Sequence, residues 1–100
     1  MQQPCHVLEL AIFTVKQQCV EQMPALRAGL RETLKSFPGL IEYRAYCPMS
    51  DDRVFVDLAT WDSFESAEKV AKAFNEGDPR FSGYMSAIEN LTFMSHFVPE

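Results

Sequence analysis

Three side chains that can exchange protons stand among apolar residues on segments that alternate like β-strands. Glu9 lies in VLELAIF, Asp57 in VFVDLATW and His96 in NLTFMSHF. Burying an unpaired carboxylate is costly, so each carboxylate requires a partner, a shared proton or a wet cavity. Histidine titrates near neutral pH and can give or take that proton. These residue types predict a proton-transfer site with Glu9, Asp57 and His96 as its catalytic groups.

Aromatic residues share the strand faces that carry the three polar groups. The period of two of a strand puts Phe55, Asp57 and Trp61 on one face of VFVDLATW. The same period puts Phe13 on the face of Glu9, and Met94 on the face of His96. We therefore expect substrate contacts from Phe13, Phe55, Trp61 and Met94.

The segments that must position these residues form one pattern along the chain. Alternating runs predict strands over 5–16, 40–47, 54–61 and 90–97, and apolar residues three and four apart predict helices near 22–37, 63–76 and 78–88. Asp62 is expected to cap the second helix, with Glu65 completing a capping box. The order βαββαβ in one domain, residues 1–100, predicts an α+β ferredoxin-like sandwich whose antiparallel four-stranded sheet has the order four, one, three, two.

In this sheet the first strand is central, so Glu9 should lie level with His96 and near Asp57. We expect the helices to cover one apolar face, made of Leu8, Leu10, Ile12, Val54, Val56, Leu58, Leu91, Phe93 and Phe97. The opposite face is then expected to hold Val7, Glu9, Ala11, Phe13, Phe55, Asp57, Ala59, Trp61, Met94 and His96. That face is too apolar to leave in water, which predicts a homodimer through the open sheet face, closed into a barrel around a cavity for a small apolar or aromatic ligand.

Two other roles for the polar trio remain open. A buried Glu9–His96 pair can have a purely structural role in a dimer interface, where each residue serves as the polar partner of the other. Two carboxylates and one histidine can also bind a metal as a facial triad. Three ligands on three strands need closer convergence than alternation guarantees, so no metal is expected.

Composition bounds the class of protein. The chain has 47% hydrophobic and 23% charged residues, which argues against disorder, and no uncharged apolar run approaches the ~18 residues of a membrane span. The net charge of −5 and the lack of a basic stripe disfavour nucleic-acid binding. Glu9 interrupts the first apolar stretch, so a secretory signal is not expected. Cys5, Cys19 and Cys47 are expected to be reduced thiols in a cytoplasmic protein.

The stretch VFVDLATWDSFESAEKVAKAF resembles the antibiotic biosynthesis monooxygenase-like superfamily of dimeric α+β barrels. The resemblance extends over the chain, because it also includes the strand end at Trp61-Asp62, the step Pro38-Gly39 and the closing strand with His96. The resemblance implies a homodimer with a pocket between sheet and helices or within the barrel. Characterised members include cofactor-free monooxygenases acting on polycyclic aromatic or quinol substrates, and haem-degrading enzymes.

The haem-degrading branch is the one that this chain resembles least. Its members pair the strand-end tryptophan with an asparagine on the first strand and a histidine on the second helix. Here the first-strand candidate is Glu9, and the segment 63–76 has no histidine. Haem is therefore disfavoured and no cofactor is expected.

Overall fold

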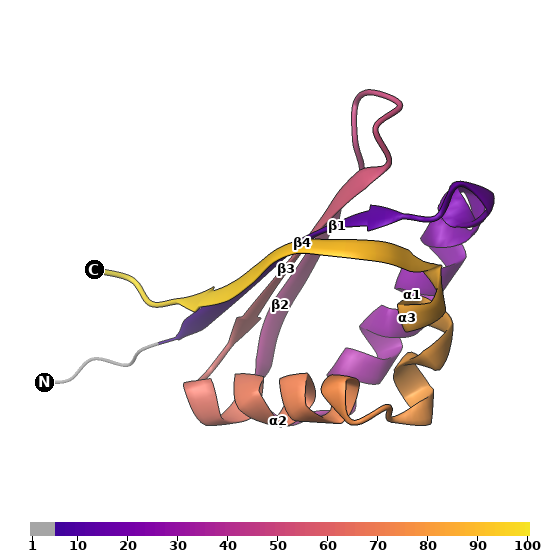
Figure 1. The fold of residues 1–100 in the computed structure, drawn as a ribbon. Coiled ribbons are helices and arrows are strands. Elements are labelled where there is room, and N and C mark those ends of the chain that lie inside the picture. The colour runs from indigo at the N-terminus through magenta and orange to yellow at the C-terminus, as the bar shows by residue number, and fades with distance from the viewer. Residues whose placement is uncertain (1–5) are drawn as a thin grey trace, which may run out of the picture.

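The alternating segments of the sequence form one antiparallel sheet, and helices cover one of its sides (Figure 1). A computed structural model describes residues 6–100. Its strands are β1 (Val7–Val15), β2 (Leu40–Tyr46), β3 (Val54–Trp61) and β4 (Ile88–Phe97), and its helices are α1 (Met23–Lys35), α2 (Phe64–Asn75) and α3 (Ser82–Ala87), with short 3₁₀ helices at Gln17–Gln22 and Pro79–Phe81. The strand order β2-β3-β1-β4 confirms the predicted α+β ferredoxin-like topology. No helix within residues 6–100 is both long and apolar enough to cross a membrane.

The helix ends follow from local chemistry. Proline is tolerated in the first turn of a helix, and α1 carries one there. At α2 the predicted cap was wrong by one residue: Ser63 is the N-cap, and its hydroxyl accepts a hydrogen bond from the Ser66 amide at 3.1 Å. Asp62 instead accepts a bond from the Ser66 hydroxyl at 2.7 Å. Ser63 takes the cap because its backbone is extended at φ −160°, as an N-cap requires.

The helices cover the sheet face opposite to the predicted one. Phe13 and Trp61 are 1% and 0% exposed, and they lie in the core between sheet and helices. Leu8, Leu10 and Ile12 point to the other side, where they are only partly buried. Alternation identifies residues that share a face, but both faces here are apolar. The face with the larger aromatic side chains fills the space beneath the helices.

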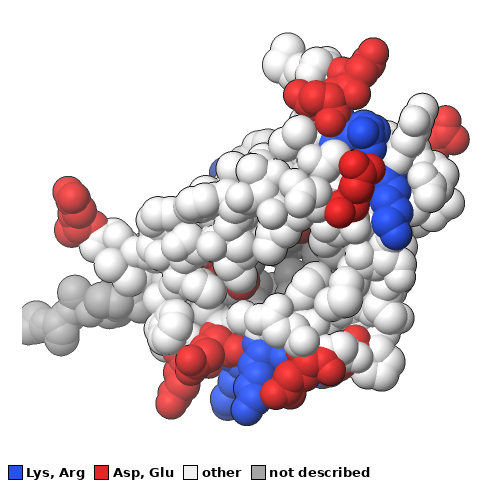
Figure 2. Space-filling model, in the orientation of Figure 1, with Lys and Arg blue, Asp and Glu red and all other residues white. Residues whose placement is uncertain are grey.

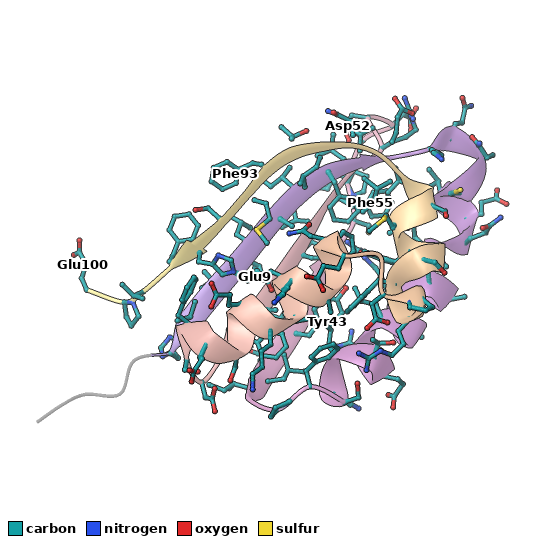
Figure 3. All side chains as sticks on the ribbon, turned by 60° about the horizontal axis from the view of Figure 1, so that its bottom comes forward. Glu9, Tyr43, Asp52, Phe55, Phe93 and Glu100 are labelled. Atoms are coloured by element: carbon teal, nitrogen blue, oxygen red, sulfur yellow. The ribbon has the colours of Figure 1, made fainter. Side chains whose placement is uncertain are left out.

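An irregularity in β4 moves one further residue. Phe93 lies opposite Ile12, but Leu91 lies opposite Phe13, so one extra residue, Thr92, interrupts the ladder. Because side chains alternate, this bulge puts Leu91 on the helix side and leaves Phe93 on the open side. The prediction that both share one face with Phe97 was therefore wrong for Leu91. Figure 3 shows Phe93 on the outer side of the sheet, away from the helices.

Candidate functional site

A cavity of about 510 Å³ lies between the sheet and the helices. Its lining comes from all four strands and all three helices, and it consists of Glu9, Ala11, Phe13, Leu30, Leu34, Tyr43, Asp57, Val70, Ala71, Phe74, Asn75, Phe81, Tyr84, Met85, Ile88, Leu91 and Met94. Figure 2 shows the molecule hollowed between β4 and α2, on a face where most residues are uncharged. The volume and the mostly apolar lining are those of a site for a small organic molecule.

Glu9 is the acidic group at one end of this cavity. It extends from β1, and the indole Nε1 of Trp61 donates a hydrogen bond to its Oε1 at 3.1 Å. Nε2 of His96 lies 3.4 Å from the other carboxyl oxygen, Oε2. This buried nitrogen lacks the alignment of a hydrogen bond and has no other partner among residues 6–100. Burial raises the pKa of Glu9, and the contacts with Trp61 and His96 oppose part of that rise.

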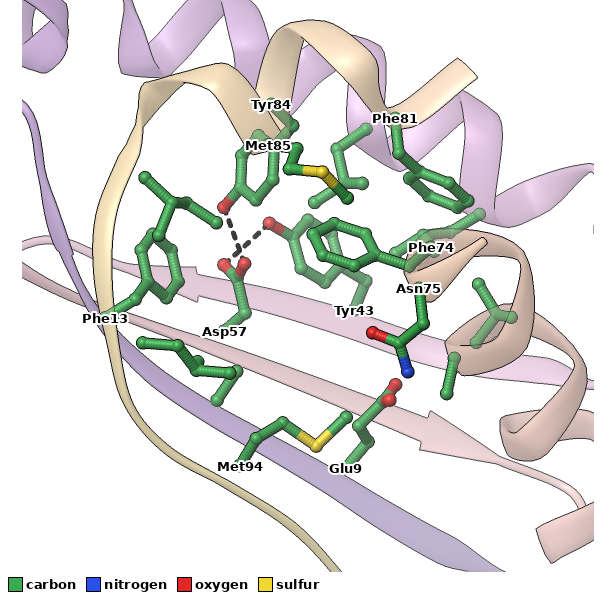
Figure 4. Close-up of a pocket in the computed structure, with 17 residues that line it drawn as sticks. Glu9, Phe13, Tyr43, Asp57, Phe74, Asn75, Phe81, Tyr84, Met85 and Met94 are labelled. Carbon is green, nitrogen blue, oxygen red and sulfur yellow. Dashed lines mark hydrogen bonds between the residues drawn. The ribbon is translucent and has the colours of Figure 1, made fainter. Parts of the chain in front are cut away.

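Asp57 is the polar group of the other end, and three donor side chains surround it. Arg27 Nη2 donates to Asp57 Oδ1 at 3.0 Å, and the Tyr43 hydroxyl donates to the same oxygen at 2.9 Å. The Tyr84 hydroxyl donates to Oδ2 at 2.5 Å. Figure 4 shows both tyrosine hydroxyls directed at this carboxyl group, that of Tyr43 from β2 and that of Tyr84 from α3. The carboxylate therefore has the charged partner that its burial requires.

The sequence patterns identified none of the three donors of this cluster, and Arg27 is the one whose position carried a signal. Its guanidinium also donates to the backbone carbonyls of Tyr46 and Val56, each at 3.0 Å, and lies 5.0 Å from the centre of the Phe55 ring. A signal was present in the sequence, since Arg27 follows Met23 by four positions and precedes Leu30 by three. A charged residue in the apolar stripe of a helix indicates a buried partner.

The pKa directions in the Asp57 cluster have a common cause. Burial raises the pKa of Asp57, while the bonds and the charge from Tyr84, Arg27 and Tyr43 oppose the rise. Burial, together with the negative charge of Asp57, also raises the pKa values of Tyr43 and Tyr84. Both phenols therefore keep their protons at neutral pH and act as donors to the carboxylate.

The structure brings the predicted catalytic residues together only in part. Glu9 and His96 are in contact, as their pairing across β1 and β4 requires. Asp57 faces the same cavity, but its bonds go to Arg27, Tyr43 and Tyr84 instead of to Glu9 or His96.

The predicted substrate contacts separate into two pairs. Phe13 and Met94 line the cavity. Phe55 and Trp61 are 4% and 0% exposed and are not among the cavity-lining residues. Phe55 instead packs against the guanidinium of Arg27. Trp61 contacts Glu9 through the hydrogen bond from its indole Nε1.

The residues described do not present a metal-binding cluster. Among residues 6–100, no three histidine, cysteine, aspartate or glutamate side chains are grouped to hold a metal ion. The facial triad fails on geometry because Asp57 turns to Arg27, away from the Glu9–His96 pair.

The fold has close counterparts among solved structures. A Chloroflexus aurantiacus protein named as an antibiotic biosynthesis monooxygenase superposes with a TM-score of 0.72 at 21% identity, over 95% of this chain and 93% of that chain. A Bordetella bronchiseptica protein of the same name gives a TM-score of 0.78 at 10% identity, over 95% and 96%. SnoaB, a cofactor-independent oxygenase from Streptomyces nogalater, gives 0.69 at 17% identity, over 95% and 91%.

Sequence comparison alone finds no counterpart, since no protein-family model and no curated protein sequence matches the chain. The likeness to the solved structures extends over nearly the whole of each chain, and it confirms the resemblance at the level of the fold. The chain therefore has the α+β fold of the antibiotic biosynthesis monooxygenase-like proteins.

Proposed function

We propose that the protein is a small cofactor-independent monooxygenase that acts on an aromatic or quinol-type molecule bound in the cavity. The observation that carries the proposal is the Glu9 carboxyl, which burial keeps at a raised pKa in an apolar cavity of about 510 Å³, with His96 beside it. A carboxylate whose pKa is raised is a stronger base than one in water. The name of SnoaB, a cofactor-independent oxygenase of the same fold, adds support.

In this proposal Glu9 removes a proton from a substrate phenol or enol. The resulting anion is electron-rich and itself reduces oxygen: one oxygen atom enters the substrate and the other leaves as water, with all four electrons supplied by the substrate. His96 accepts the proton from Glu9, because its Nε2 lies 3.4 Å from Oε2. Phe13 and Met94 hold the ring system against the sheet.

Oxygen uptake with a panel of hydroquinones and polyphenols tests this function. Wild-type protein should consume oxygen with at least one compound, and Glu9→Gln should lower the rate roughly a hundredfold or more, the typical contribution of a general base. Glu68→Gln, an exposed change on α2, is the matched control. A wild-type rate no higher than that of Glu9→Gln across the panel would remove the proposal.

We also propose that the protein is a homodimer through its open sheet face. The open face carries Phe93 and Phe97, which stack on each other and are 42% and 43% exposed. The half-buried Leu8, Leu10 and Ile12 extend this apolar surface across the sheet. Such a continuous apolar surface is typical of an interface. The interface uses the face opposite to the one expected from sequence, so the cavity lies within one protomer.

A non-catalytic binding protein is the second candidate. It is favoured by Asp57, whose three donor side chains make it a structural anchor instead of a base. This candidate predicts that aromatic ligands bind and are recovered unchanged. Product analysis by chromatography after aerobic incubation separates the two functions.

A further inference from the structure

At the Asp57 end of the cavity, a bound molecule finds a hydrogen-bond acceptor and no free donor. The donors at this end are already used: the hydroxyls of Tyr43 and Tyr84 both donate to Asp57. Arg27 donates to Asp57, to Tyr84 and to two backbone carbonyls, and it is not among the cavity-lining residues. Arg27 uses four of its five N–H groups in these bonds. A ligand group that needs a donor therefore finds none free on Tyr43 or Tyr84, the two of these residues that line the cavity.

Asp57 can accept one more hydrogen bond. A carboxylate offers about four acceptor positions. Oδ1 takes the bonds from Arg27 and Tyr43, whereas Oδ2 takes the bond from Tyr84 alone. Asp57 also lines the cavity. The free position on Oδ2 is complementary to a hydroxyl group of a bound molecule.

Asp57 and Glu9 lie at a spacing that one small molecule can span. In the β1–β3 register Glu9 is opposite Ala59 and Asp57 is opposite Ala11, so the two acids are diagonal neighbours on one face. Diagonal neighbours in a sheet lie ~7–8 Å apart. Aromatic rings of Phe13, Phe74 and Phe81 line the space around them (Figure 4). The site therefore fits flat rings with polar groups at both ends.

The charges of the site restrict the ligand further. The positive charge of Arg27 is matched by Asp57 at 3.0 Å. Glu9 adds a second acid, and no arginine or lysine is among the lining residues to match it. An anionic ligand would place a further negative charge between two carboxyl groups in an apolar cavity, which is costly. The ligand that fits is neutral.

We propose that Asp57 is the specificity residue of the cavity, and that it selects a neutral dihydroxy aromatic of one or two rings whose hydroxyls lie at opposite ends. One hydroxyl lies at Glu9, which removes its proton under the function proposed above, on which this inference rests. The other hydroxyl donates to Oδ2 of Asp57 and keeps its proton. Tyr43, Tyr84 and Arg27 are positioning residues that hold Asp57 ready for this bond.

Calorimetric titration without oxygen tests the selection independently of turnover. The probes are a naphthalenediol with one hydroxyl on each ring, the naphthol that lacks one of these hydroxyls, and the dimethyl ether that keeps both oxygens but donates nothing. We expect the diol to bind roughly tenfold to a hundredfold more tightly than the naphthol, the range for a hydrogen bond to a charged group. The ether should bind more weakly than either.

Two variants assign the preference to Asp57. Asp57→Asn should bring the affinities for diol and naphthol within about threefold of each other, because the amide offers a donor and lacks the charge. Asp51→Asn makes the same change at an exposed position in the loop between β2 and β3, outside the cavity lining, and should keep the wild-type preference. If Asp57→Asn does not fold, the three-probe series on wild-type protein still decides. Equal affinities for diol, naphthol and ether would overturn the inference.

The two proposals fail in different experiments. A diol that binds with the expected preference but consumes no oxygen contradicts the monooxygenase and supports the selection. Oxygen consumption with the naphthol at the rate of the diol, together with equal affinities, supports the monooxygenase and overturns the selection.

Discussion

At the scale of single residues, the burial of the Glu9 carboxyl group makes it a stronger base and also makes the stability of the fold depend on pH. Its pKa is raised in the folded protein above the ordinary value of a glutamate, mainly by burial. The native state therefore binds this proton more tightly than the unfolded state. By linkage, the favourable contribution of the protonated group is present at low pH and is lost as pH rises through the raised pKa.

Glu9→Gln tests this sign directly. Relative to wild type, the variant should gain unfolding free energy as the pH is raised from about 5 to about 8, because glutamine has no charge to bury. Urea unfolding at both pH values measures the difference. Glu68→Gln, which is exposed on α2, should show no such dependence. A Glu9→Gln effect of the same size at both pH values would contradict the burial of this carboxyl group.

The Arg27–Asp57 pair is the second feature at this scale. The side chains are 10% and 15% exposed, so removing one leaves the other charge largely buried. Arg27→Met should lower the unfolding free energy by about 3–5 kcal/mol. Combining it with Asp57→Leu should restore much of the loss, because no charge then remains unpaired.

The control for that pair is Arg44→Met. Arg44 pairs with Glu42 at 2.9 Å, but the two side chains are 60% and 51% exposed, so water screens the interaction. Its loss should leave the denaturant midpoint close to that of wild type. Denaturant midpoints for Arg27→Met and Arg44→Met that agree within error would show that burial does not strengthen the first pair.

At the scale of elements, Gly39, just before β2, packs closely against the residues at the start of α2. Gly39 has φ +98°, and a Cβ there would overlap the Ser66 hydroxyl and lie 2.5 Å from Asp62 Oδ1. Its carbonyl accepts a hydrogen bond from the Asp62 amide at 2.8 Å. The positive φ and the close approach both require glycine.

Gly39→Ala should therefore destabilise the protein by more than about 1 kcal/mol, because both the strain and the contact oppose a Cβ. Gly29 is the matched control, since it lies inside α1 and a Cβ added there would meet no atom within 4 Å. Gly29→Ala should stabilise by about 0.5–1 kcal/mol through helix propensity. Thermal unfolding of both variants measures the opposite signs, and a stabilising Gly39→Ala would contradict the packing of this junction.

At the scale of the whole molecule, the proposed dimer makes the open sheet face the surface to test. Phe93→Glu places a charge in the exposed aromatic pair of the proposed interface, so the mass measured by light scattering should fall from that of a dimer to that of a monomer. Met49→Glu, at a fully exposed position in the loop between β2 and β3, should leave the mass unchanged. A Phe93→Glu protein with the wild-type mass would place any dimer contact elsewhere.

Much of this molecule follows from sequence alone. Local periodicity reports secondary structure directly, so the alternating segments and the helical stripes predict the elements. The order of these elements, βαββαβ, then predicts the strand order of the sheet. Strand pairing also brings Glu9 level with His96. The elements, the strand order and the Glu9–His96 pairing depend only on the residue pattern within each segment and on the order of the segments, and both can be read from the sequence.

Tertiary structure alone decides which face the helices cover and what Asp57 binds. Alternation divides a strand into two faces but does not rank them when both are apolar, so Phe13 and Trp61 lie under the helices against expectation. The bulge at Thr92 then puts the Leu91 side chain on the face of the sheet that the helices cover. Arg27 reaches Asp57 from 30 positions away, and only the packing of α1 on the sheet brings that charge to the carboxylate.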